Sequence, residues 1–198
     1  MAAPPSGAAE VCARLELLRA ICPRSVPEAP YGNAGPPIGV QGAYADGGAA
    51  SCLDGQANAH KIGSTRCVYE TFQLEAGAPT QEGTPPPRFA HATFYASRRP
   101  IPRLFGLRAW CAGGRKPLAD GLVRRRLEQG VCLGPVRAGG EAGTLALEPT
   151  YPVGGEVGGH LVLSWKRGGV EYAATLHAWA PLRQAVAVLR RMVSSARA

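Results

Sequence analysis

Two histidines near the C-terminus are the residues best placed to do chemistry together. Apolar and polar residues alternate from His160 to His177 on both sides of Gly168-Gly169, and adjacent glycines tolerate the positive φ angles of a tight hairpin turn. Counting outward from this turn places His160 directly across from His177. Opposed side chains have Cβ atoms about 5 Å apart. The two imidazoles can therefore share a metal ion, share a proton, or form a solvated or hydrogen-bonded pair, which is the simplest interpretation.

A metal ion on this pair needs further ligands, because zinc and copper take three or four. His91, on a strand predicted farther upstream, and His60 are the available histidines. The candidate metal site is therefore His160, His177 and His91. The Gly-rich runs lack the Lys-Ser/Thr ending and the following helix of a phosphate-binding loop, so we expect no cofactor.

Signatures of hydrolytic enzymes are missing from the sequence. No Gly-x-Ser-x-Gly motif is present to hold a serine nucleophile. Among the acids, Glu70, Glu148 and Glu171 fall on predicted strands and could converge as a carboxylate pair, but solvated strand faces are the favoured explanation. A non-catalytic function is favoured, and the catalytic residues of any enzymatic alternative stay unknown.

The elements around the histidines indicate which face of the hairpin forms the core. Apolar side chains share the face opposite the histidines: Leu161, Leu163, Trp165, Tyr172, Ala174 and Leu176. A helix over 180–197 follows, and its apolar residues form one stripe: Leu182, Ala185, Val186, Leu189, Met192 and Val193. We predict that this helix packs on the apolar face of the sheet.

Upstream segments supply the remaining elements. Residues 1–22 are predicted to contain a helix, Ala8–Ile21, and apolar spacing predicts another at 117–129. Within the sheet region, 64–179, strand signals occur at 66–74, 89–97, 104–111, 131–136 and 144–148. Residues 23–63 are dominated by Gly, Ala and Pro; this long loop is functional, held by a disulfide, or contains a hidden strand.

The fold class follows from these elements. A chain of 198 residues has room for one ordinary core. We predict a single α+β domain in which an antiparallel β-sheet packs with N-terminal and C-terminal helices and is stapled by disulfides.

Six cysteines form an even set without the short gaps of zinc sites. Nearest-neighbour disulfides are favoured: Cys12 with Cys22, Cys52 with Cys67, and Cys111 with Cys132. Such bridges place the protein in an oxidising space outside the cytoplasm, whereas six reduced thiols would place it in the cytosol. Met1 is not followed by a secretion signal, so we expect a mature secreted form, and no apolar run is long enough to span a membrane.

Positive charge is concentrated in the second half of the chain. The net charge is +8, and sixteen of the 22 Lys and Arg residues lie within 98–198. Five of them are candidate anion-binding residues: Arg124, Arg125, Arg126, Lys166 and Arg167. An anionic polymer or surface is one partner that this excess allows, although the ordinary surface of an Arg-rich protein is the favoured explanation.

The hairpin and the last helix carry one resemblance. With Trp165, Gly168-Gly169 and Tyr172, residues 157–197 resemble the closing hairpin and helix of uncharacterised bacterial extracytoplasmic domains of the lipoprotein-carrier-like kind. The resemblance implies a curved antiparallel sheet in a secreted or envelope-facing bacterial protein. It implies no functional residue, and the six cysteines depart from its pattern.

Three functions remain for this sequence. The first is a secreted or cell-envelope domain for binding or assembly, which contacts anionic partners through its basic half; self-association stays open. The second is a secreted hydrolase of a polymer, with its site between the polar sheet face and residues 23–63. The third is a carrier of an apolar ligand in a curved sheet. A pocket with histidine and carboxylate together would favour the hydrolase, and a dry apolar cavity would favour the carrier.

Overall fold

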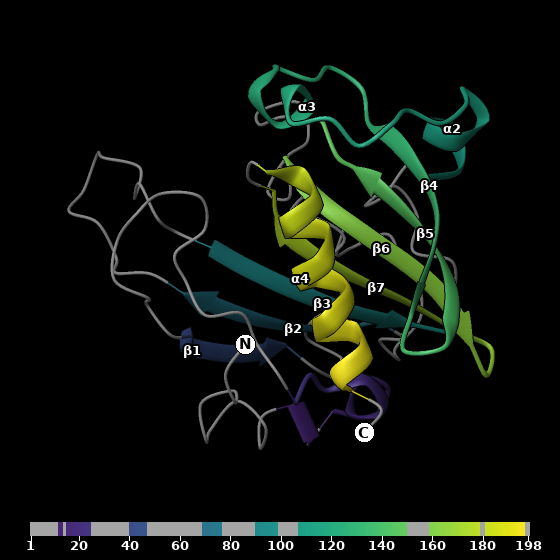
Figure 1. The fold of residues 1–198 in the computed structure, drawn as a ribbon. Helices are drawn as coiled ribbons and strands as arrows, with labels where there is room; N and C mark the ends of the chain where they lie inside the picture. Colours follow the sequence, from purple (N-terminus) through teal and green to yellow (C-terminus); the bar gives the residue numbers. More distant parts are fainter. Residues whose placement is uncertain are drawn as a thin grey trace, which may run out of the picture.

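The computed structural model describes residues 12–13, 15–24, 40–46, 69–76, 90–98, 107–149, 159–178 and 181–196. Its strands form one antiparallel sheet in the order β1-β2-β3-β7-β6-β5-β4 (Figure 1). The strands are β1 (Val40–Asp46), β2 (Tyr69–Ala76), β3 (Ala90–Ser97), β4 (Val131–Ala138), β5 (Glu141–Leu147), β6 (His160–Arg167) and β7 (Val170–His177). Two meanders, β1 to β3 and β4 to β7, meet where β3 pairs with β7. The predicted α+β fold is confirmed.

The β6–β7 hairpin has the predicted register. Gly168 and Gly169 have φ angles of 56° and 77°, which only glycine adopts without strain. His160 pairs with His177, and Trp165 pairs with Tyr172. Because each strand alternates its side chains between the two faces, this register fixes which residues of the neighbouring strands share a face with the histidines.

Helix α4 (Leu182–Ser195) covers one face of the sheet (Figure 1). Its buried side chains are the predicted set: Leu182, Ala185, Val186, Leu189, Met192 and Val193. They share a core with Trp165 and Tyr172, whose rings stack with centroids 5.7 Å apart. The Leu182 backbone N–H donates a hydrogen bond to Asp120 Oδ1 at 2.6 Å, so a distant side chain satisfies one of the free donors at the start of the helix.

The N-terminal helix prediction is wrong over its described part. Residues 12–13 are helical, the chain then turns, and a 3₁₀ helix, η1, covers Leu18–Ile21. The disulfide between Cys12 and Cys22 explains the break. Ten residues of α-helix would separate the two Cα atoms by about 15 Å, whereas they lie 5.8 Å apart. The helix and this disulfide are incompatible, and the disulfide forms; Leu18 and Ile21 still reach the core.

The predicted strand at 104–111 is also wrong, because its described residues form helix α2 (Leu107–Ala112). Leu107 and Trp110 are three residues apart, so they share one side of a helix, and a short apolar run fits a strand or a helix equally. Leu107 packs on the face of the sheet opposite α4, and Trp110 packs against the same cluster. The remaining members of this cluster are Tyr95, Ala146, Val162 and Ala173.

Only one turn of the predicted 117–129 helix forms, as α3 (Gly121–Arg124). The Lys116 N–H donates a hydrogen bond to the Cys132 carbonyl at 2.8 Å, so the segment between these residues must close on itself. A helix over 117–129 would extend about 20 Å, and the three residues left could return at most about 10 Å. The closure therefore limits the helix, while Leu122 and Leu127 still pack against the core.

Other predictions differ in detail or fall outside the described residues. The 23–63 segment contains the strand β1, β2 begins three residues later than predicted, and β4 and β5 are longer than their signals. Cys12–Cys22 and Cys111–Cys132 confirm two of the expected disulfides. Cys52, Cys67 and His60 lie outside the described residues. None of the described helices is both long and apolar enough to cross a bilayer.

Candidate functional site

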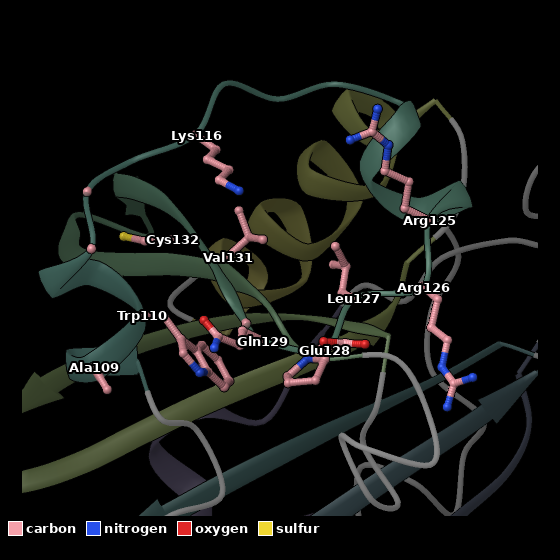
Figure 2. A pocket seen from close by; sticks show the side chains of 14 residues that line it. Ala109, Trp110, Lys116, Arg125, Arg126, Leu127, Glu128, Gln129, Val131 and Cys132 are labelled. Carbon is pink, nitrogen blue, oxygen red and sulfur yellow. The ribbon is translucent and has the colours of Figure 1, made fainter.

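An open groove of about 920 Å³ lies between α2 and the segment 125–132 (Figure 2). Its size falls in the range of small-molecule sites. The lining residues are Ala109, Trp110, Gly113, Gly114, Lys116, Arg125, Arg126, Leu127, Glu128, Gln129, Gly130, Val131, Cys132 and Pro149. The groove is thus a feature of the long β3–β4 connection, at the end of the sheet where β4 begins.

Three interactions hold the walls of the groove. The Cys111–Cys132 disulfide joins α2 to β4, and the hydrogen bond from Lys116 to Cys132 closes the same wall. The Trp110 indole lies against the backbone of Gly130, where a Cβ atom would approach ring carbons to 2.1 Å. Any larger residue at position 130 would displace the indole, so glycine is required there.

Cations stand on both sides of the groove. Figure 2 shows Lys116 on one side and Arg125 and Arg126 on the other, with Leu127 and Val131 between them. The side chains of these three cations are exposed. One carboxylate, Glu128, also lines the groove. The lining therefore mixes apolar and polar surface and carries a net positive charge.

The predicted anion-binding residues do not form one surface. Arg125 and Arg126 line the groove, whereas Arg124 belongs to α3 and does not. Lys166 and Arg167 lie at the hairpin turn, at the opposite end of β6 from His160. There Lys166 pairs with Glu171 in the strand register, and Arg167 Nε lies 3.9 Å from a carboxylate oxygen of Glu141.

A row of titratable side chains lies next to the groove. The rings of His160 and His177 are 5.0 Å apart, edge to face. The Glu148 N–H donates to the His160 carbonyl at 2.9 Å, so Glu148 continues the register of β5 opposite His160. Pro149, which follows Glu148, lines the groove. Three neighbouring strands thus place Glu148, His160 and His177 side by side on the face opposite α4.

Glu148 is buried, with 1% of its surface exposed. Neither carboxylate oxygen has a hydrogen-bond partner among the described residues. Burial raises the pKa of Glu148 from 4.5 to about 9, because the charged form loses its hydration without compensation. Glu148 is therefore a neutral carboxylic acid at pH 7, and the solvated strand face expected for it is wrong.

The histidines are also removed from water. His160 is 2% exposed and His177 is partly buried. Burial lowers the pKa of His177 below its ordinary value of 6.5, since desolvation disfavours the imidazolium. His160 lies across from His177, as predicted. Because His160 is buried and His177 is partly buried, the two imidazoles do not form a solvated pair.

The metal hypothesis gains no support from the described side chains. No three His, Cys, Asp or Glu side chains in the described part of the chain come close enough to hold a metal ion. Ala92 pairs with Leu176, which puts His91 at the next register position, beside His177; its side chain lies outside the description. Glu70 pairs with Ala96 of the α4 face.

Sequence reasoning missed the groove and the burial of Glu148. Trp110 lay inside a predicted strand, and Lys116 lay between that strand and the predicted helix at 117–129. The signal that could have found them is the Cys111–Cys132 pairing, because it closes a loop with a sequence separation of 21, and the many Arg and Gly residues of that loop favour an exposed surface over a place in the core. Glu148 could have been placed opposite His160 by extending the hairpin register to a third strand.

Comparison of the chain with protein-family models, curated proteins and solved structures returned no match.

Proposed function

We propose that this protein is a non-catalytic binding domain that works outside the cytoplasm and holds an anionic partner in the groove beside α2. The observation that carries the proposal is the arrangement of Lys116, Arg125 and Arg126 around one groove with an aromatic floor. Cations on both sides of the groove attract an anion at long range.

The composition of the groove favours binding over the two other functions. No histidine lines it, and its carboxylate, Glu128, is exposed, so the combination that would favour a hydrolase is missing from the described lining. An apolar carrier requires a dry cavity, whereas this groove is open and carries charged side chains. The disulfides support a location in an oxidising space.

Binding of fluorescein-labelled dextran sulfate tests this function. We expect the wild type to bind it at about 10 mM salt and to lose affinity steeply by about 300 mM, because salt screens exposed charges. The double variant Lys116→Gln, Arg126→Gln should bind at least about tenfold more weakly, since each exposed contact contributes about 1 kcal/mol. Fluorescence anisotropy measures both effects.

The matched control is the double variant Arg183→Gln, Arg191→Gln. It removes the same charge from exposed positions on α4, far along the chain from the groove. We expect it to bind as the wild type does. Equal losses in the two double variants would mean that net charge alone attracts the probe, and the groove would then have no role.

A further inference from the structure

We propose that three histidines on the sheet face opposite α4 bind a transition-metal ion that joins the two meanders. His160, His177 and His91 belong to β6, β7 and β3, which are neighbours in the sheet. The site goes beyond the anion-binding function proposed above, because none of the three histidines lines the groove. Three observations carry it: the strand register, the geometry of the His160–His177 pair, and the buried carboxyl group beside that pair.

The strand register brings the three histidines into one row. His160 pairs with His177 across β6 and β7. Ala92 pairs with Leu176 across β3 and β7, so His91 occupies the position next to His177. Ala92 and Leu176 belong to the core under α4, and successive residues of a strand alternate between faces, so the histidine row is on the opposite face. Neighbouring strands lie about 4.8 Å apart, so an ion above the middle strand, β7, is within the length of a histidine side chain from all three.

The spacing of the described pair fits a shared ion. The rings of His160 and His177 have an interplanar angle of 79° and centroids 5.0 Å apart. Two imidazoles that bind one tetrahedral ion through bonds of about 2.1 Å have centroids about 5 Å apart. Burial lowers the pKa of His177, so its imidazole is neutral at pH 7, and the neutral form is the one that binds a metal ion. His177 is also partly exposed, which gives an ion access to the row.

The carboxyl group of Glu148 independently points to a cation. The Glu148 N–H donates to the His160 carbonyl, which places the two residues side by side. Glu148 is 1% exposed, and its carboxylate oxygens have no hydrogen-bond partner among the described residues. Such a group calls for an explanation, and a cation bound nearby supplies one. Carboxylates beside metal-bound histidines accept a hydrogen bond from the second ring nitrogen and thereby orient the imidazole.

The other end of the row has the same order. His91 pairs with Glu75 of β2. Alternation along a strand explains why such positions are polar, but it does not require an acid at each end of three histidines. Two carboxylates beside three neutral imidazoles match the charge of a divalent ion. In the strand order β5-β6-β7-β3-β2, the row is Glu148, His160, His177, His91 and Glu75.

Titration of the metal-free protein with Zn²⁺ and with Ca²⁺ tests the site. The full chain is treated with a chelator, its disulfides are kept intact, and binding is followed by isothermal titration calorimetry. We expect one Zn²⁺ ion per chain and no Ca²⁺ binding in the same concentration range, because imidazole favours transition metals and calcium takes oxygen ligands. At a free Zn²⁺ concentration about 100-fold above the Kd, the melting temperature should rise by about 5 to 10 °C.

Substitutions identify the ligands. His177→Gln and His91→Gln should each weaken Zn²⁺ binding by at least about 100-fold, since losing even the hydrogen-bond partner of a ligand costs about 10-fold to 100-fold. Glu148→Gln should weaken it by about tenfold for that reason. The matched control is His60→Gln, which removes the remaining histidine of the chain and should bind Zn²⁺ as the wild type does.

Each outcome decides for or against the row. Absence of Zn²⁺ binding would overturn it, and so would unchanged affinity in a folded His91→Gln variant or a loss confined to His60→Gln. Equal binding of Zn²⁺ and Ca²⁺ would assign the ions to carboxylates and overturn the histidine site. If neither His91→Gln nor His177→Gln folds, Co²⁺ bound to the wild type decides, because its visible absorption is intense in a tetrahedral nitrogen site and weak in an octahedral oxygen site. Binding of dextran sulfate tests the groove separately.

Discussion

The two faces of the sheet differ in what they bury. The face under α4 buries apolar side chains in one cluster that runs from Cys12 to Val193. The other face carries the buried polar side chains of the described residues, which are Thr93, Ser97, Glu148, His160 and Thr175, together with the small apolar cluster around Leu107. Along their strands, these five residues alternate with residues of the apolar cluster under α4.

This difference separates stability from function. Apolar burial is the main favourable contribution to folding, so the α4 face holds the fold together. A carboxyl group buried without a partner destabilises the folded state, and such groups gather at functional sites. The polar face also lies next to the groove, through Pro149. The following substitutions probe the contrast, from the largest expected effect to the smallest.

Leu189→Asp should abolish folding. Leu189 has no exposed surface. The free-energy cost of burying an unpaired carboxylate there is comparable to the whole free energy of unfolding of an ordinary domain, about 5 to 15 kcal/mol. Thermal unfolding followed by circular dichroism should show no cooperative transition. Gln184→Asp, at an exposed position in the first turn of α4, should unfold like the wild type, and a folded Leu189→Asp variant would contradict the role assigned to this face.

Glu148→Gln should stabilise the protein at neutral pH. The folded-state pKa of Glu148, about 9, lies above its ordinary 4.5, so the carboxyl group favours the folded state fully only below pH 4.5. That contribution is lost as pH rises toward 9. The wild type loses about 1.4 kcal/mol of stability per pH unit in this range. The free energy of unfolding of the glutamine variant, relative to that of the wild type, should therefore be about 3 kcal/mol higher at pH 7 than at pH 4.

Urea denaturation at a series of pH values measures this effect. The two proteins carry equivalent neutral side chains at position 148 near pH 4, so that point serves as the internal control. Parallel curves of unfolding free energy between pH 5 and pH 8 would show that the carboxyl group is solvated, and the polar face would then lose its main distinction.

His177→Gln should have a smaller effect, on the acid side. Burial lowers the pKa of His177, so the unfolded chain takes up a proton below pH 6.5 before the folded protein does. The wild type therefore loses stability as pH falls through this window. Between pH 7 and pH 5, the free energy of unfolding of the variant should fall less than that of the wild type in the same urea denaturation series. An identical dependence of this free energy on pH in the two proteins would contradict burial of this imidazole.

The sequence predicted those parts of the fold in which local pattern and long-range constraint agree. The glycine turn and the alternation around it placed His160 across from His177, and helical spacing identified the buried stripe of α4 including Leu189. Both patterns extend over many residues and have distinct periods, which makes them the strongest signals in a single sequence.

Prediction failed where the chain is closed by a crosslink. The Cys12–Cys22 disulfide excludes the continuous N-terminal helix, and the Lys116–Cys132 hydrogen bond excludes the helix at 117–129. Apolar periodicity contains no information about such closures. The candidate groove shares this origin, since its walls are residues brought together by the Cys111–Cys132 bridge, and the burial of Glu148 depends on a third strand that pairs only in the folded sheet.

The strand order has a consequence for how the protein is made. Strands β4 to β7 and α4 follow one another along the chain and contact each other directly, so they can form a nucleus through local pairings. Within the described sheet, the meander of β1 to β3 joins these strands at β7, where Thr175 donates a hydrogen bond to the Thr93 carbonyl across 82 residues. We therefore expect the first half of the chain, although it leaves the ribosome first, to fold after the second half.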